Sequence, residues 1–283
     1  MTHRVTLLDL WKNIMYKYSR KKLIAVGCSF TEHYLVSSQS PHIDHDFIRW
    51  PQYLAEMLDM GFINLGRSGA GNDQILAKTL DAMLKEKDVG LVVLMWSEWQ
   101  RIGFQLNKIW NIWHQVTPHA PFKDYSLKLF ELQNPLHATR NALRTFIHAE
   151  KILRGVPYML IQGTNNISYY NVETSKGIDC SPGTPHENMN FYKLNDSREQ
   201  TAREMFACND YFKYIENNIG DKFIGWPIMR ELGGYCISDI LEKEDPLRTT
   251  LRISQDDSHP NAAGHKFMAD FLYNKYREIY NEH

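Results

Sequence analysis

Two short polar segments near opposite ends of the chain carry residue types that can do acyl-transfer chemistry. Ser29 stands in a GCSFT segment, residues 27–31, directly after an apolar run, and Asp256 precedes His259 by three positions in a DDSHP segment. A carboxylate in such a turn can accept a hydrogen bond from the histidine Nδ1–H, which leaves Nε2 free to take a proton from a serine hydroxyl. The sequence therefore predicts Ser29 as a nucleophile, His259 as a general base and Asp256 as the acid that orients it.

Two of these residues have rivals nearby in the sequence. Cys28 precedes Ser29 and is itself a nucleophile type, but successive side chains on an extended strand end point to opposite sides, so we expect the thiol to face the core. His33 follows Ser29 by four positions and is an alternative base, although no acidic residue stands at helical spacing to orient it. Because a serine in a loop is most often a capping residue, the prediction depends on the order of the segments along the chain.

The elements that must position these residues follow from the hydrophobic pattern. Apolar runs predict four strands, and periodic apolar stripes predict five helices after the first strand besides one near the N-terminus. The strands are expected at 23–27, 62–65, 91–95 and 158–162, and the helices at about 49–60, from Asn72 or Asp73 onward, and at about 138–154, 198–217 and from Asn261 onward. Strands that alternate with helices indicate a mostly parallel sheet, whose ligands bind beyond the carboxyl ends of the strands.

The order of three segments resembles the SGNH (GDSL-type) hydrolase superfamily. Residues 27–31 are similar to its first block, with Cys28 in place of Asp and Phe30 in place of Leu. Residues 64–69 are similar to its second block and residues 256–260 to its last block. The GCSFT form and the Trp-Ser stretch after the third predicted strand resemble a divergent subset met among phage-encoded members.

The resemblance implies both a fold and a set of site residues. The fold would be a three-layer α/β/α sandwich, flavodoxin-like, with a parallel sheet of about five strands. Ser29, His259 and Asp256 would form a catalytic triad, and the backbone N–H groups of Ser29 and Gly69 would hold the oxyanion.

One block departs from the family. The family's third block, Gly-x-Asn-Asp, should follow the third strand, but residues 95–101 read MWSEWQR and contain no Asn. Ser97 stands nearest to the expected Asn position, and its hydroxyl can donate a hydrogen bond over a shorter reach. Asn72, at the start of the helix after the glycine loop, is the alternative donor that we favour. Arg101 and Trp96 are expected to help bind the substrate.

Composition limits the class of protein. Lys and Arg number 32 against 33 Asp and Glu, and this balance argues against a nucleic-acid binder. No apolar run approaches the roughly 20 residues that a membrane span needs. The first residues have scattered charges and no cleavage site, so we expect no signal peptide and a cytoplasmic or virion-associated protein. The chain is expected to form one domain, 1–283, with an N-terminal helix over about 1–20 and insertions at about 102–136 and 163–195.

The cysteines and one histidine-rich segment raise the questions of a disulfide bridge and a metal site. The four cysteines form no CxxC pair and are expected as reduced thiols, with a Cys180–Cys208 bridge left open. The segment 42–46 contains His42, Asp44, His45 and Asp46, which have the composition of a zinc site. We favour a solvated loop beside the cleft, since serine chemistry needs neither a metal nor another cofactor.

These observations predict a serine ester hydrolase that acts on a small-molecule or carbohydrate ester and removes a short acyl group such as acetyl. The carbohydrate preference comes from the resemblance and from the 12% aromatic content. Two alternatives stay open: a non-catalytic SGNH scaffold that serves as a binding or virion structural protein, and an acyltransferase that uses the same triad. The acyl group, the acceptor, the oligomeric state and any protein partner are not fixed by the sequence.

Overall fold

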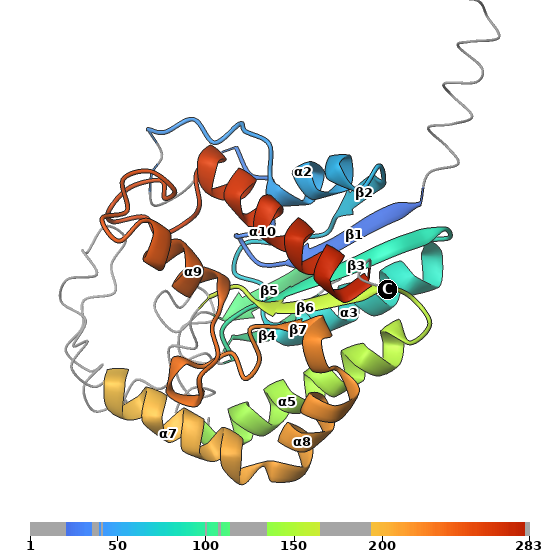
Figure 1. Ribbon diagram of the computed structural model, residues 1–283, viewed down its shortest axis with the longest axis vertical. Helices are drawn as coiled ribbons and strands as arrows, with labels where there is room; N and C mark the ends of the chain where they lie inside the picture. Colours follow the sequence, from blue (N-terminus) through green and yellow to red (C-terminus); the bar gives the residue numbers. More distant parts are fainter. Residues whose placement is uncertain are drawn as a thin grey trace, which may run out of the picture.

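A parallel sheet of five strands forms the centre of the computed structural model, which describes residues 21–35, 40, 42–99, 101–106, 109–113, 135–164 and 194–280 (Figure 1). The strand order is β2-β1-β3-β6-β7. The strands are β1 (Lys22–Gly27), β2 (Gly61–Asn64), β3 (Val89–Trp96), β6 (Tyr158–Gln162) and β7 (Phe223–Ile224). In this doubly wound order the winding reverses between β1 and β3, and ligands bind at the carboxyl ends of such a pair of strands.

The central strands are apolar on both faces. β3 is buried from Gly90 to Trp96, and β1 from Leu23 to Gly27. Such near-continuous hydrophobic runs are typical of parallel strands that are covered on both sides. Gly27 at the end of β1 pairs with Met95 near the end of β3, so both strands open onto the same edge of the sheet.

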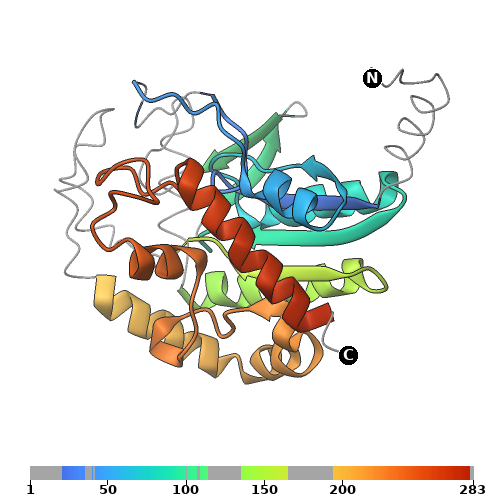
Figure 2. The same cartoon turned by 45° about the horizontal axis from the view of Figure 1, so that its top comes forward.

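Helices cover both faces of the sheet, which gives three layers (Figure 2). Side chains of α3, α5, α7 and α8 pack with Ile24 and Leu94 in one core, and side chains of α2, α9 and α10 pack with Leu23 and Val93 in the other. The predicted three-layer α/β/α sandwich is therefore confirmed. The helices are α2 (Trp50–Met57), α3 (Asn72–Lys85), α5 (Pro135–Leu153), α7 (Leu194–Ala207), α8 (Asn209–Asn218), α9 (Ile237–Glu244) and α10 (Ala262–Tyr280), with short 3-10 turns η3 (Gly220–Lys222) and η4 (Arg230–Leu232).

Several elements differ from the sequence prediction. The single helix expected at 198–217 is wrong: the chain forms α7 and α8, separated by Cys208, whose backbone (φ -84°, ψ 43°) leaves the helical region. α9 and β7 were not predicted. β7 has two residues, too few to show any periodicity, and it lies just before a turn that Gly225 enters with a positive φ of 80°.

The predicted insertions are described only in part. Residues 102–136 begin with an antiparallel ribbon of β4 (Ile102–Leu106) and β5 (Ile109–Trp113), where an irregular segment was expected. Residues 114–134 and 165–193, the N-terminal helix expected over 1–20, and Cys180 lie outside the described residues. The other three cysteines are buried free thiols. No helix in the described ranges is long and apolar enough to cross a membrane.

Candidate active site

Ser29 stands on a tight turn at the end of β1. The backbone N–H groups of Thr31 and Glu32 both donate to the carbonyl of Cys28, at 2.9 and 3.0 Å, which folds the chain back at this point. A Cβ on Gly27 would lie 2.3 Å from Thr31 Oγ1, so this turn requires glycine. Cys28 is buried and packs in the core, as expected, while Ser29 is half-buried.

His259 joins this turn to a carboxylate from the other end of the chain. Its Nε2 lies 2.8 Å from Ser29 Oγ, and its Nδ1 lies 2.6 Å from Asp257 Oδ1. The contact between Ser29 and His259 is the one that the sequence predicts. Both distances are hydrogen-bond distances, within about 2.6–3.2 Å, so His259 is placed to take a proton from Ser29 while its other nitrogen is held by the carboxylate.

The carboxylate in contact with His259 belongs to Asp257, and the prediction of Asp256 as the partner of His259 is wrong. Asp256 is exposed, whereas Asp257 is 1% exposed. The physical reason is an Asx turn, in which an aspartate binds the backbone two positions later in the chain. Asp257 Oδ1 accepts the backbone N–H of His259 at 3.1 Å and also contacts the Nδ1 of the His259 ring. Consecutive aspartates in the sequence left this one-residue choice open.

The carboxylate of Asp257 is held in its charged form. Burial acts to raise the pKa of Asp257, but hydrogen bonds from His259 and Ser40 and the charge of His259 outweigh burial and lower it. Ser40 Oγ donates to Asp257 Oδ2 at 3.0 Å, so the two carboxylate oxygens have different partners. An ionised acid at this position can fix the histidine tautomer and stabilise the imidazolium.

The loop that carries Asp257 and His259 is braced on both sides. Ile253 N–H donates to the carbonyl of His259 at 2.9 Å, and Arg252 Nη1 donates to the carbonyl of Ser258. The side chain of Asn261 donates to the carbonyl of Arg252 at 2.9 Å and caps the start of α10 through Gly264 N–H. These bonds fix the histidine relative to the sheet.

Ser40 connects the carboxylate to a buried polar cluster. His45 Nε2 lies 3.1 Å from the carbonyl of Ser40, and Arg49 Nη2 donates to the carbonyl of His45 at 2.9 Å. The Arg49 guanidinium contacts the rings of Tyr34 and Phe47, with its central carbon 4.5 and 3.9 Å from their centroids. The sequence expectation of a solvated loop is therefore wrong for His45, which is fully buried.

The other members of the 42–46 segment lie at the surface. His42, Asp44 and Asp46 are exposed, and Asp44 Oδ1 accepts the backbone N–H of Asp46 at 2.8 Å. The rival base His33 is also exposed and lies 3.5 Å from a carboxylate oxygen of Asp46. Over the described residues, no group of three His, Cys, Asp or Glu side chains is placed to hold a metal ion.

The glycine loop after β2 packs against the serine turn. Glu32 accepts the backbone N–H of Ser68 at 2.6 Å and pairs with Arg67 at 3.3 Å. Gly69 has a positive φ of 75°, which glycine adopts at no steric cost. In the part of the chain that the structure describes, the N–H groups of Ser29 and Gly69 donate to no other group. Glu32 gives no signal in the sequence, because its contacts lie 35 and 36 positions away.

Asn72 does not reach into the cleft as predicted. Its Oδ1 accepts the N–H of Ser97 at 2.8 Å, and its Nδ2 donates to the carbonyl of Ser97 at 3.2 Å. The same carbonyl accepts Gln162 Nε2 at 2.8 Å. The amide of Asn72 therefore fixes the end of β3. The buried hydroxyl of Ser97 has no hydrogen-bond partner among the described residues.

Replacing Asn72 with alanine is expected to lower the free energy of unfolding by about 1–3 kcal/mol, because the buried N–H of Ser97 loses its acceptor. Chemical denaturation measures this change. Asp81→Ala, at an exposed position of the same helix, is the matched control and should stay within about 0.5 kcal/mol of the wild type. Equal stability of the two variants would show that the Asn72–Ser97 pair is not structural.

The two residues predicted to bind substrate are both enclosed. Trp96 is 0% exposed, and its ring packs 5.1 Å from that of Phe146, so its predicted contact with substrate is wrong. Arg101 pairs with Glu98 at 3.1 Å and has an 8% exposed side chain. Burial acts to lower the pKa of Arg101, but Glu98 and Cys28 raise it overall. Its substrate-binding role stays a prediction.

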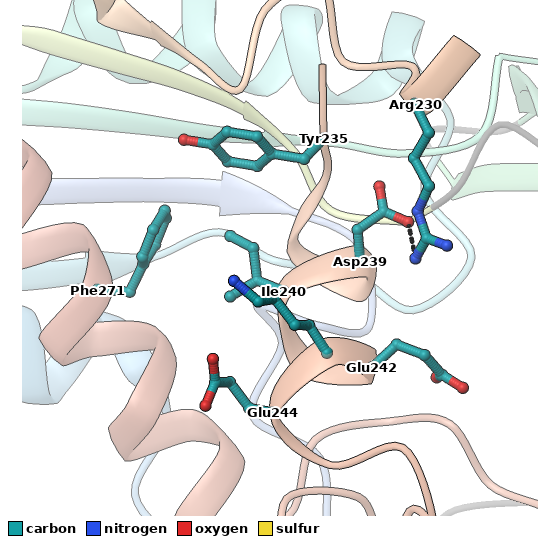
Figure 3. A pocket seen from close by; sticks show the side chains of 8 residues that line it. Arg230, Tyr235, Asp239, Ile240, Glu242, Glu244 and Phe271 are labelled. Carbon is teal, nitrogen blue, oxygen red and sulfur yellow. Dashed lines mark ion pairs between the residues drawn. The ribbon is translucent and has the colours of Figure 1, made fainter. Parts of the chain in front are cut away.

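A cavity of about 610 Å³ lies between α9 and α10 (Figure 3). Tyr235, Ile240 and Phe271 line one part of it, and the ion pair of Arg230 and Asp239 lies at another. Neither Ser29 nor His259 lines this cavity.

No family model and no curated protein matches the chain. Among solved structures, it is similar to a protein assigned to the lipolytic G-D-S-L family from Desulfitobacterium hafniense (12% identity, TM-score 0.44, 90% of this chain and 99% of that chain covered). It is also similar to a carbohydrate acetylesterase family member from Sinorhizobium meliloti (13% identity, TM-score 0.42, 92% and 99% covered). Identities this low, with TM-scores below 0.5, assign neither a family nor an activity to the chain.

Proposed function

We propose that the chain is a serine ester hydrolase of the SGNH type, with Ser29 as nucleophile, His259 as general base and Asp257 as orienting acid. The observation that carries this proposal is the continuous contact from Ser29 Oγ through the His259 ring to Asp257, at 2.8 and 2.6 Å. A hydroxyl, an imidazole and a buried carboxylate in this order are the arrangement that activates a serine for acyl transfer.

The reaction would proceed in two halves. Ser29 Oγ attacks the acyl carbon while His259 Nε2 takes its proton, and the imidazolium then gives that proton to the leaving alcohol. A water molecule, deprotonated by the same nitrogen, attacks the acyl carbon of the acyl-enzyme. The bond to Ser29 Oγ breaks, the imidazolium returns the proton to Oγ, and the acid is released. Asp257 stabilises the imidazolium in both halves without becoming protonated itself.

The oxyanion would be held mainly by backbone groups. The N–H groups of Ser29 and Gly69 have no internal acceptor among the described residues, so both are available to a developing negative charge. The two side-chain donors named from the sequence are both withdrawn from the substrate: the Asn72 amide is occupied by Ser97, and the Ser97 side chain is 0% exposed, so the two backbone N–H groups are the proposed donors.

The substrate class is proposed as a short acyl ester, with an acetylated carbohydrate as the natural example. This preference rests on the sequence resemblance alone, since Trp96 is buried in the core and does not offer a surface for stacking against a sugar ring.

Turnover of aryl acetate, butyrate and octanoate tests the proposal. We expect the acetate to be cleaved fastest, with free acid and alcohol released in equal amounts. A sugar acceptor that diverts the acyl group would indicate a transferase. No turnover above that of Ser29→Ala on any of the esters would contradict catalysis and favour a scaffold.

Ser40→Ala is expected to lower kcat by about 10-fold, because Asp257 loses the hydrogen bond to its Oδ2 and orients His259 less well. Ser40→Thr keeps the hydroxyl and should restore most of kcat, with KM little changed in both variants. Melting temperatures serve as the control. Loss of kcat in Ser40→Thr equal to that in Ser40→Ala would show that Ser40 acts through packing instead.

A further inference from the structure

A second cavity, of about 340 Å³, lies beside the proposed active site. Its wall includes the chain neighbours of the triad residues: Phe30 follows Ser29, and Ser258 precedes His259. The Phe30 ring packs edge-on against the imidazole of His259, with 5.5 Å between centroids. The cavity is lined by Phe30, Glu98, Thr164, Arg230, Ser238, Glu242, Arg248, Arg252 and Ser258.

Arginines from separate segments converge on this cavity, and two of the three already have acidic partners. Arg248 Nε pairs with Glu242 at 3.2 Å, and Arg230 Nη2 pairs with Asp239 at 2.6 Å. The second acid of the lining, Glu98, pairs with Arg101. The acids around the cavity are therefore matched one to one by cations, and Arg252 is left over.

Arg252 places an unmatched positive charge in the wall. It is 2% exposed, and no carboxylate of the described residues forms an ion pair with it. Its Nη1 and Nη2 donate to the carbonyls of Ser258 and Ser238, and its Nε has no partner there. The guanidinium carbon lies 5.9 Å from the centroid of the Phe30 ring.

Burial of this charge has a cost that an anion would offset. Burial is the main cause that lowers the pKa of Arg252 to about 10, with the charge of Glu242 opposing this shift and that of Arg248 adding to it. The group still carries its proton at neutral pH, so the wall stays positive. A desolvated cation without an acidic partner is unfavourable unless another group compensates it.

We propose that this cavity binds an oxyanion carried by the substrate, a carboxylate, phosphate or sulfate on the part of the ester that does not react. The proposal rests on the proposed function for the position of the ester at Ser29. Among the described residues, Nη2 of Arg248 and Nη1 of Arg230 contact no acceptor, so two more cationic donors are available beside Arg252. The volume matches that of small-molecule sites, which begin at about 300 Å³.

Matched acetate esters test the preference. The anionic set is 4-carboxyphenyl, 4-sulfophenyl and 4-phosphophenyl acetate, and the neutral control is methyl 4-acetoxybenzoate, with each rate divided by the rate of hydroxide hydrolysis. We expect kcat/KM to be about 10-fold higher for at least one anionic ester, and the preference to shrink as NaCl is added. The three anionic esters distinguish which oxyanion fits.

Arg248→Gln should reduce the anionic-to-neutral ratio of kcat/KM by about 10-fold, because the cavity loses one cationic donor. Arg248 is chosen over Arg252, whose guanidinium also holds the carbonyl of Ser258 in the triad loop. Arg277→Gln, at an exposed position of α10, is the control and should leave the ratio unchanged.

Anion binding without turnover gives a second readout. Calorimetry of Ser29→Ala with benzoate, sulfate and inorganic phosphate should detect binding that Arg248→Gln weakens about 10-fold in the same background. Arg248-dependent binding in a protein that cleaves no ester would support the cavity assignment and contradict the proposed function. Ester turnover with no anionic preference and no Arg248-dependent binding would overturn the inference and leave the proposed function standing.

Discussion

Ser29→Ala is expected to lower kcat on an aryl acetate by about 10⁴-fold or more, without unfolding the protein. The serine supplies the oxygen that forms the acyl-enzyme, and the structure places that oxygen 2.8 Å from His259 Nε2. His259→Ala removes the only base in contact with it among the described residues and should cost a similar factor. Steady-state kinetics and a melting curve of each variant measure the two effects separately.

Cys28→Ala is the matched control for this experiment. The thiol is buried in the core and lies next to Ser29 in the sequence, so its removal tests the rival nucleophile directly. We expect kcat to change by less than about 10-fold, with some loss of stability from the smaller side chain. A larger loss of kcat in Cys28→Ala than in Ser29→Ala would reverse the choice of nucleophile.

Asp257→Asn should lower kcat by on the order of 10³–10⁴-fold, whereas Asp256→Asn should change it less than about 2-fold. An amide at position 257 can present its N–H to the histidine ring and so favours the wrong tautomer. Asp256 is exposed and has no contact with His259 among those the structure gives. The two variants remove the same charge from adjacent positions, so a general electrostatic effect would act on both.

The reverse result, with the large loss in Asp256→Asn, would restore the acid that the family spacing predicts. Equal losses in both variants would mean that the loop exchanges the two carboxylates. The free energy of unfolding of Asp257→Asn must be measured as well, because Asp257 also accepts a hydrogen bond from the Ser40 hydroxyl and its loss can destabilise the fold.

The parts of the fold that the sequence predicts best are those whose signal is local. β1, β3 and β6 are continuous apolar runs because both of their faces are buried, and α10 keeps one apolar stripe along its whole length. β7 gives no such signal, since two residues form it. The break between α7 and α8 depends on the backbone of Cys208, which hydrophobic periodicity does not show.

In the candidate site, too, the residues with a local sequence signal were predictable and those positioned by distant contacts were not. Ser29 and His259 were identifiable because their segments hold residue types that fit the chemistry and follow one another along the chain in the expected order. Ser40 was not, because it meets Asp257 across 217 positions of the chain. The choice between Asp256 and Asp257 depends on a turn geometry, and the position of Asn72 depends on backbone groups at the end of β3. The order of side-chain types along the sequence shows neither the turn geometry nor these backbone positions.

Labelling with a fluorophosphonate tests most directly whether Ser29 is an activated nucleophile. The native protein is treated with the probe, digested and mapped by mass spectrometry, beside His259→Ala and a heat-unfolded sample. We expect one modified residue, Ser29, with much slower labelling in His259→Ala and none after unfolding. Absence of label on Ser29 in the folded protein, or labelling that survives unfolding or the loss of His259 at an equal rate, would contradict the account.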